Sequence, residues 1–163
     1  MRWSKRHRHT FDDKAPKPAS KFLEEHRIPP KPKHYYDRKP GRCRFCGHVV
    51  KTDQGQPNKR ARWHSDCVDQ YNIMYHPNDA RKAVWQRDNG RCVQCDVNMP
   101  KTSRKPQQRW HVDHIRPLWE QKGKKFKDLD LSYWELTNLQ TLCAKCHGKK
   151  SAKEAGIRAK KSK

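Results

Sequence analysis

Seven cysteines fall into two spaced sets, and their spacing constrains the fold more than any other feature of the chain. His64 stands three residues before Cys67 and completes the first set, which gives two groups of four donors with no cysteine left over. Structural zinc sites take four such ligands in a tetrahedron, whereas a disulfide framework prefers an even number of cysteines. The predicted zinc sites are Cys43, Cys46, His64 and Cys67, followed by Cys92, Cys95, Cys143 and Cys146.

The composition agrees with a metal-stabilised fold that has little apolar core. Only 32% of the 163 residues are hydrophobic, against about 45–50% in ordinary globular chains. The formal net charge of +22 predicts a polyanionic partner, with nucleic acid first and an anionic membrane surface second. No apolar run approaches the roughly 20 residues that span a bilayer, so no membrane association is expected.

The cysteines also indicate the compartment. Zinc-bound thiolates stay reduced, which predicts an intracellular, reducing setting such as the cytoplasm. The first residues, Met1 to His7, are charged and no apolar segment follows them, so we expect no signal peptide.

Changes in composition divide the chain into four segments. Residues 1–41 form a basic, proline-rich arm that is expected to be largely disordered. The accessory zinc module follows at 42–76, a second zinc module at 77–158 and a basic tail at 159–163. The arm either tracks phosphates or is a solvated tail, two readings of equal weight. Its candidate nucleic-acid contacts are Arg2, Lys5, Arg6 and Arg8.

Local patterns predict a small α+β fold built from two similar zinc modules, each resembling a treble clef. Gly47 in the first Cys-x2-Cys turn is expected to take a positive φ, and Ser65 is expected to cap the helix that follows His64. Residues 109–115 and 138–142 are predicted strands of one hairpin. The last helix is predicted to begin near Cys143 and to end at Glu154, before Gly156.

Asp113 and His114 combine two chemistries that a metal-dependent hydrolase needs side by side. A carboxylate can hold a divalent cation, and an imidazole, whose ordinary pKa is about 6.5, can take a proton from water near neutral pH. Such a pair alone is more often structural. The second zinc set brackets this pair, and His147 directly follows its last cysteine, which favours a catalytic site.

The motif order resembles the HNH endonuclease family. The sequence has Cys-x2-Cys, then His-Val-Asp-His-Ile-x-Pro-Leu, then Asn-Leu-Gln-x-Leu-Cys-x2-Cys-His, over roughly residues 79–155. The resemblance implies a ββα-metal fold in which a hairpin and a helix hold one catalytic divalent cation. The first zinc unit looks like an accessory found in some members.

The resemblance also implies roles for single residues. His114 would be the general base, while Asp113 and His147 would hold the catalytic cation. Asn138 would brace the loop that carries His114 or join the metal shell. Carboxylate and imidazole accept Mg²⁺, Mn²⁺, Ni²⁺ or Zn²⁺, so the ligands do not fix the metal. Products with a 5′ phosphate and a 3′ hydroxyl are expected.

Four further positions complete the prediction. Some family members carry a second histidine where this sequence has Ser151, which leaves the third protein ligand of the cation open. Arg116, Lys149 and Lys150 are candidate phosphate contacts. His111 lies on the same strand face as Asp113 and either supports the metal site or is a partly exposed histidine.

These features predict a metal-dependent HNH endonuclease that cuts DNA and contacts mainly its backbone. The alternative is a zinc-stabilised nucleic-acid-binding protein whose site is inert. Small HNH proteins of this kind often occur in phage, some beside packaging genes, so packaging or recombination proteins are candidate partners and the host cytoplasm is a candidate location.

Overall fold

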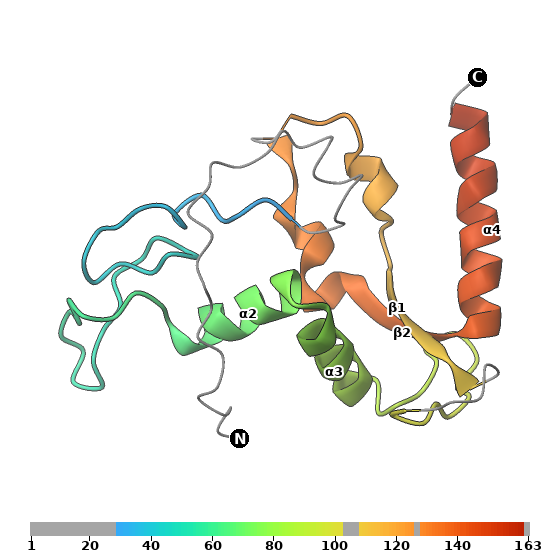
Figure 1. The fold of residues 1–163 in the computed structure, drawn as a ribbon, viewed down its shortest axis with the longest axis horizontal. Coiled ribbons are helices and arrows are strands. Elements are labelled where there is room, and N and C mark those ends of the chain that lie inside the picture. The colour runs from blue at the N-terminus through green and yellow to red at the C-terminus, as the bar shows by residue number, and fades with distance from the viewer. Residues whose placement is uncertain (1–28, 103–107, 126–127, 162–163) are drawn as a thin grey trace.

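The computed structural model describes residues 29–102, 108–125 and 128–161 and confirms a small α+β fold. A two-stranded sheet lies among helices, and the long last helix stands at one side of the molecule (Figure 1). The main elements are α2 (Ser65–Tyr75), α3 (Pro77–Arg87), β1 (Trp110–His114), β2 (Leu139–Cys143) and α4 (Ala144–Lys161). Three short 3-10 helices join them: η2 (Leu118–Gln121), η4 (Leu131–Trp134) and η5 (Leu136–Asn138).

Each zinc module contains the same tight turn. The N–H of Gly47 donates to Cys43 O in the first turn, and the N–H of Asp96 donates to Cys92 O in the second, each at 2.8 Å. Gly47 has the expected positive φ of 78°, but the second turn places Asp96 at a φ of 56°. Aspartate tolerates this left-handed region better than most residues because its short side chain can bond locally. The two turns therefore have one backbone geometry despite different sequences.

The accessory module ends in α2, and α3 follows it. The N-cap of α2 is His64, in an extended conformation, so the prediction that Ser65 caps this helix is wrong. The Ser65 hydroxyl instead donates a hydrogen bond to the Asp66 carboxylate at 3.3 Å. Pro77 begins α3, where a missing N–H costs nothing because the first helical N–H groups have no intrahelical partner.

The hairpin of β1 and β2 is antiparallel and leads directly into α4. Asp113 pairs with Gln140, and His114 pairs with Leu139. Strand β1 is shorter than predicted, because Arg109 and Ile115 lie outside it, and β2 is shifted by one residue, because Asn138 belongs to η5 and Cys143 to the strand. All five residues of β2 are buried, which fixes its register between β1 and the helices that cover it.

Helix α4 is longer than predicted. It continues past Glu154 to Lys161, through Gly156 and into the predicted basic tail. A glycine inside a helix costs only about 1 kcal/mol relative to alanine, and good helix formers such as Ala159 and Lys160 surround it. The prediction that Gly156 ends this helix is therefore wrong.

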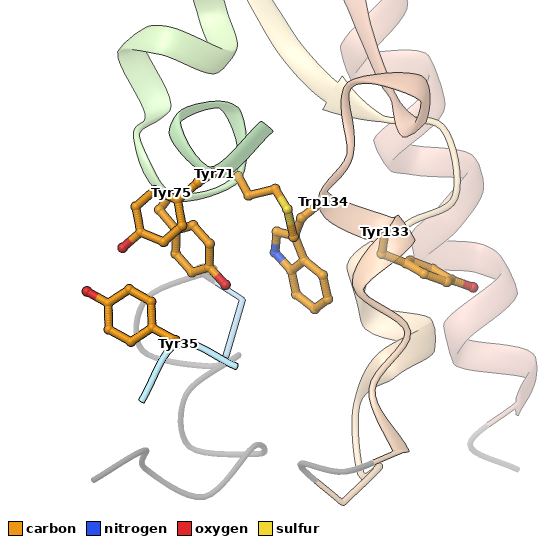
Figure 2. Close-up of a cluster of buried hydrophobic side chains, with 6 residues drawn as sticks. Tyr35, Tyr71, Tyr75, Tyr133 and Trp134 are labelled. Carbon is orange, nitrogen blue, oxygen red and sulfur yellow. The ribbon is translucent and has the colours of Figure 1, made fainter. Parts of the chain in front are cut away.

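The two Cys-x2-Cys turns, Cys43–Cys46 and Cys92–Cys95, are the first and second zinc knuckles. An aromatic cluster joins the segment before the first knuckle to α2 and η4 (Figure 2). Tyr35 is 2% exposed and stacks on Tyr71 with 5.9 Å between ring centroids. The Tyr75 hydroxyl donates to the Pro30 carbonyl. The Lys31 ammonium lies over the Tyr75 ring, 4.4 Å from its centroid. Residues 1–41 were predicted to form a largely disordered arm, but in its last part, residues 29–41, these aromatic contacts offset the entropy cost of ordering the chain.

The same cluster includes Met74 and Trp134, so the predicted small core of the accessory module extends to η4. In Figure 2 the rings of Tyr35, Tyr71 and Tyr75 lie together, with Trp134 between them and Tyr133. One apolar cluster therefore connects segments that precede β1 with the segment between β1 and β2.

Helix α3 is fastened to β2 at its C-terminal end. The Arg87 guanidinium donates to the carbonyls of Leu136 and Leu139, each at 2.6 Å. The Asp88 carboxylate accepts from the Thr141 N–H at 2.9 Å. Val84, which is fully buried, packs against Leu139. These contacts fix α3 against the hairpin.

Candidate active site and metal centres

The four donors of the first predicted zinc site lie together. Their ligand atoms are all within 4.8 Å of one another, with Cys46 Sγ 3.5 Å from His64 Nδ1. His64 Nε2 lies 3.2 Å from the Val49 carbonyl oxygen, which can only accept a hydrogen bond. Nε2 therefore carries the proton and leaves Nδ1 free to bind a metal, as is usual for histidine ligands.

The second predicted zinc site is equally compact. The sulfur atoms of Cys92, Cys95, Cys143 and Cys146 also lie within 4.8 Å of one another. Burial opposes ionisation of Cys92, but backbone N–H groups outweigh it and lower its pKa to about 7. Burial and the neighbouring thiols instead raise the pKa of Cys146 to about 12. Four crowded thiols cannot all ionise alone, so this set suits a dication that binds them as thiolates.

All seven cysteines are free thiols, and both groups of donors fit structural zinc. The second group joins the turn before β1 to the junction of β2 and α4, where Cys143 ends the strand and Cys146 lies in the first turn of the helix. Its geometry therefore sets the position of the residue that follows, His147.

His147 on α4 and Asp113 on β1 meet beside the sheet. His147 Nε2 lies 3.8 Å from Asp113 Oδ1, and the carboxylate is mostly buried. An imidazole nitrogen and a carboxylate oxygen this close form a donor set that divalent metals accept. The residues present thus fit a catalytic cation held between hairpin and helix.

The second oxygen of Asp113 is held by two neighbours. Gln140 Nε2 donates to Asp113 Oδ2 at 2.9 Å, and Lys150 Nζ lies 2.9 Å from the same oxygen. Lys150 also donates to the His114 carbonyl at 2.7 Å and to the Glu154 carboxylate. Oδ2 is thereby fixed and Oδ1 is turned toward His147.

These contacts give Lys150 a different place from the predicted phosphate contact. Burial opposes its charge, but hydrogen bonds to Glu154 and Asp113 keep its pKa above the ordinary value. Gln140 was not among the predicted site residues. Pairing the Asn-Leu-Gln motif with the Asp-His strand would have found it, because Gln140 lies directly across from Asp113.

His111 lies against His147 on the same face of β1 as Asp113. The two imidazole rings are stacked with their centroids 4.3 Å apart. Burial, then the positive charges that His147 and Arg81 can carry, lower the pKa of His111. The His111 ring therefore packs against the His147 ring, and its role at the metal site stays a prediction.

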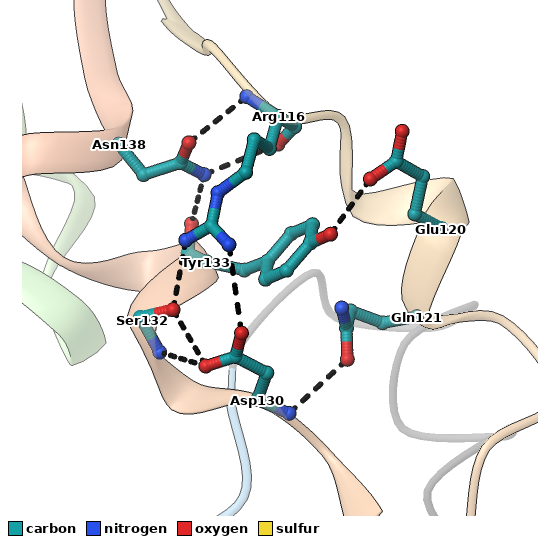
Figure 3. A network of polar contacts seen from close by, with 7 residues as sticks. All are labelled: Arg116, Glu120, Gln121, Asp130, Ser132, Tyr133 and Asn138. Carbon is teal, nitrogen blue, oxygen red and sulfur yellow. Dashed lines mark hydrogen bonds and ion pairs between the residues drawn. The ribbon is translucent and has the colours of Figure 1, made fainter.

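Asn138 braces the loop after His114 (Figure 3). Its side-chain oxygen accepts from the Arg116 N–H at 2.9 Å, and its nitrogen donates to the carbonyls of Arg116 and Tyr133 at 3.1 and 2.8 Å. Asn138 is 4% exposed and these three bonds engage its amide. Of the two predicted roles, the geometry agrees with the brace rather than with the metal shell.

Replacing Asn138 with alanine is expected to destabilise the fold, because three backbone groups lose their partner. Each buried polar group left unpaired costs about 1–3 kcal/mol. The change is measured as a lower midpoint of urea unfolding. Asn78→Ala, at an exposed position in the first turn of α3, is the matched control and should shift stability by less than about 0.5 kcal/mol. Equal stability of the two variants would contradict the bracing role.

Arg116 belongs to the same network. Its guanidinium donates to the Ser132 hydroxyl at 2.7 Å and lies 4.2 Å from the centroid of the Tyr133 ring. Asp130 pairs with it at 3.5 Å. The side chain predicted to contact phosphate is thus engaged within the protein.

The remaining predicted contacts divide between two regions. Lys149 is exposed on α4 beside the site, whereas Arg2, Lys5, Arg6 and Arg8 lie outside the described residues. A cavity of about 780 Å³ opens at Asp113, His114 and His147.

A family model described as HNH endonuclease matches residues 92–153, the stretch that contains this site. Residues 92–153 form an HNH endonuclease domain. The matched region of the HNH domain begins at the second knuckle and ends within α4.

A mouse protein, the DNA annealing helicase and endonuclease ZRANB3, is similar to this chain. The two are 27% identical over 156 residues, which covers 72% of this chain and 14% of the mouse protein. The chain therefore spans a small part of that relative. No solved structure matches the chain. Within the described residues, no helix is both long and apolar enough to cross a bilayer.

Proposed function

We propose that the HNH domain hydrolyses DNA phosphodiester bonds, with one catalytic divalent cation and His114 as general base. The observation that carries this proposal is the 3.8 Å approach of His147 Nε2 to Asp113 Oδ1, next to His114 at the end of β1. Residues far apart in sequence meet here in a metal-binding donor set. The match to the HNH endonuclease family supports DNA as substrate.

Each residue has one task in this proposal. Asp113 and His147 would hold Mg²⁺, Mn²⁺, Ni²⁺ or Zn²⁺, which would neutralise the scissile phosphate and stabilise the departing 3′ oxygen. His114 accepts the proton of the attacking water. The backbone around His114 is held in place, because Lys150 donates to the His114 carbonyl and Asn138 accepts from the Arg116 N–H in the loop that follows. The products would carry a 5′ phosphate and a 3′ hydroxyl.

The Lys and Arg excess supports DNA binding through phosphates. A net charge of +22 predicts an affinity that falls steeply with salt. The two structural zinc sites would hold the scaffold and take no part in the chemistry. Phage packaging or recombination proteins are proposed partners on the family resemblance alone.

The test is nicking of supercoiled plasmid by protein that retains its structural zinc but has been freed of other cations. Nicking is expected only after Mg²⁺, Mn²⁺ or Ni²⁺ is added or zinc is supplied in excess. The zinc content is measured before and after treatment as the control for folding. DNA binding without cutting under all four ions would instead support the zinc-stabilised, non-catalytic alternative.

A further inference from the structure

Trp119 separates two hollows on the surface of the HNH domain. It lies in η2, and it lines both the cavity that opens at the catalytic residues and a second hollow of about 440 Å³ beside α4. Pro117 and Glu154 border both hollows as well. The two are therefore neighbours on either side of one indole.

The first hollow combines apolar walls with the catalytic residues. Leu118, Trp119 and Trp134 line it together with Asp113 and His147. Its volume of about 780 Å³ lies within the range of sites that bind small organic molecules. The Trp119 indole N–H is buried and has no hydrogen-bond partner among the described residues. A flat, partly polar group placed next to the scissile phosphate would fit these walls.

The second hollow is lined by lysines of α4. Lys149, Lys153 and Lys161 border it, and the Lys161 ammonium lies 5.1 Å from the centroid of the Trp119 ring. Its two carboxylates are already paired, Glu120 with the Tyr133 hydroxyl and Glu154 with Lys150. Glu120 keeps its negative charge in this hydrogen bond, but the four lysines that line the hollow, Lys150 included, outnumber its two carboxylates.

Exposed apolar side chains accompany the lysines. Ile115, just after β1, is 50% exposed, and Ile157 on α4 is 38% exposed. Both line the second hollow. Lysines beside exposed apolar groups and an aromatic ring are the elements with which proteins bind single-stranded nucleic acid, whose backbone follows the charges while its bases stack.

We propose that Trp119 and the two hollows beside it bind an unpaired segment of the DNA strand next to the scissile phosphate. A base enters the cavity at Trp119, and the neighbouring phosphates follow Lys149, Lys153 and Lys161. A paired base stays within its duplex and cannot reach this cavity without being extruded. The substrate class is then DNA with unpaired nucleotides at the cut. This inference rests on the proposed nuclease function for the position of the scissile phosphate.

The first experiment measures binding of labelled DNA to the full chain by fluorescence anisotropy, without an added catalytic cation. A duplex with a short unpaired bulge is compared with the matched perfect duplex. Stacking of one base predicts roughly tenfold tighter binding of the bulged DNA. Trp119→Ala should abolish this preference, and Trp119→Phe, which keeps an aromatic ring, should retain most of it. Equal affinities in the wild-type protein, or a preference that survives Trp119→Ala, would overturn the proposal.

The second experiment tests the lysines with a matched control. Replacing Lys149, Lys153 and Lys161 by glutamine should reduce the slope of log affinity against log salt on single-stranded DNA by about 2. The control replaces Lys51, Lys59 and Arg60, which are exposed in the accessory module, and removes the same charge. A similar loss of slope in both triple variants would contradict a path along α4.

These outcomes separate the inference from the proposed function. Metal-dependent nicking with no preference for unpaired DNA would support the proposed nuclease function and contradict the binding of unpaired DNA at Trp119. A Trp119-dependent preference for unpaired DNA with no cutting would contradict the proposed nuclease function and support the binding site at Trp119.

Discussion

The His114→Ala protein is expected to lose DNA cleavage by roughly 10²–10⁴-fold, the usual contribution of a general base. It should still fold and bind DNA, because alanine keeps the backbone carbonyl that accepts from Lys150. The rate of plasmid nicking at saturating Mn²⁺ measures the loss.

The matched control for this variant is His48→Ala, an exposed histidine of the accessory module that lies outside the cavity. It should cleave at the wild-type rate. Circular dichroism and zinc content are measured for both variants. If His114→Ala loses zinc or helical signal, the residue is part of the scaffold and the assignment as base fails.

Replacing Cys143 with serine is expected to unfold the HNH domain. Structural zinc in small domains contributes about 10–16 kcal/mol of apparent binding energy, which is as large as the whole stability of a typical domain. Cys143 ends β2 and directly precedes α4, so loss of this ligand separates the hairpin from the helix. Loss of one zinc per chain and of helical signal would be observed together.

Val93→Ser serves as the control, since Val93 is 50% exposed within the second knuckle. Its zinc content should match that of the wild-type protein. A Cys143→Ser protein that is soluble, folded and fully active would contradict the structural role of the second zinc site.

The cysteine spacing predicted the outline of the fold because a metal site ties distant segments to one point. Two turns with the same backbone pattern and a hairpin that leads into the last helix follow from that constraint. Helix ends were harder to predict. Gly156 is a plausible stop in sequence, but a glycine penalty is small and α4 continues to Lys161.

The site was predictable where a motif fixes the residue type, and less so where side chains choose among partners. Asp113 and His147 meet as the motif suggested. Lys150, by contrast, could reach solvent, phosphate or carboxylate from its place on a helix, and only the fold brings it to Asp113. The burial of Tyr35 could not be predicted from the sequence, because basic and proline residues dominate the composition around it.

The attachment of α3 to β2 has a consequence for any attempt to isolate the HNH domain. A fragment cut at residue 92, where the family match begins, would lack Arg87 and Asp88 and would leave three main-chain groups of the hairpin region without their partners. It would also uncover Leu139 where Val84 now packs. The smallest self-sufficient piece that contains the HNH domain therefore has to start upstream of α3.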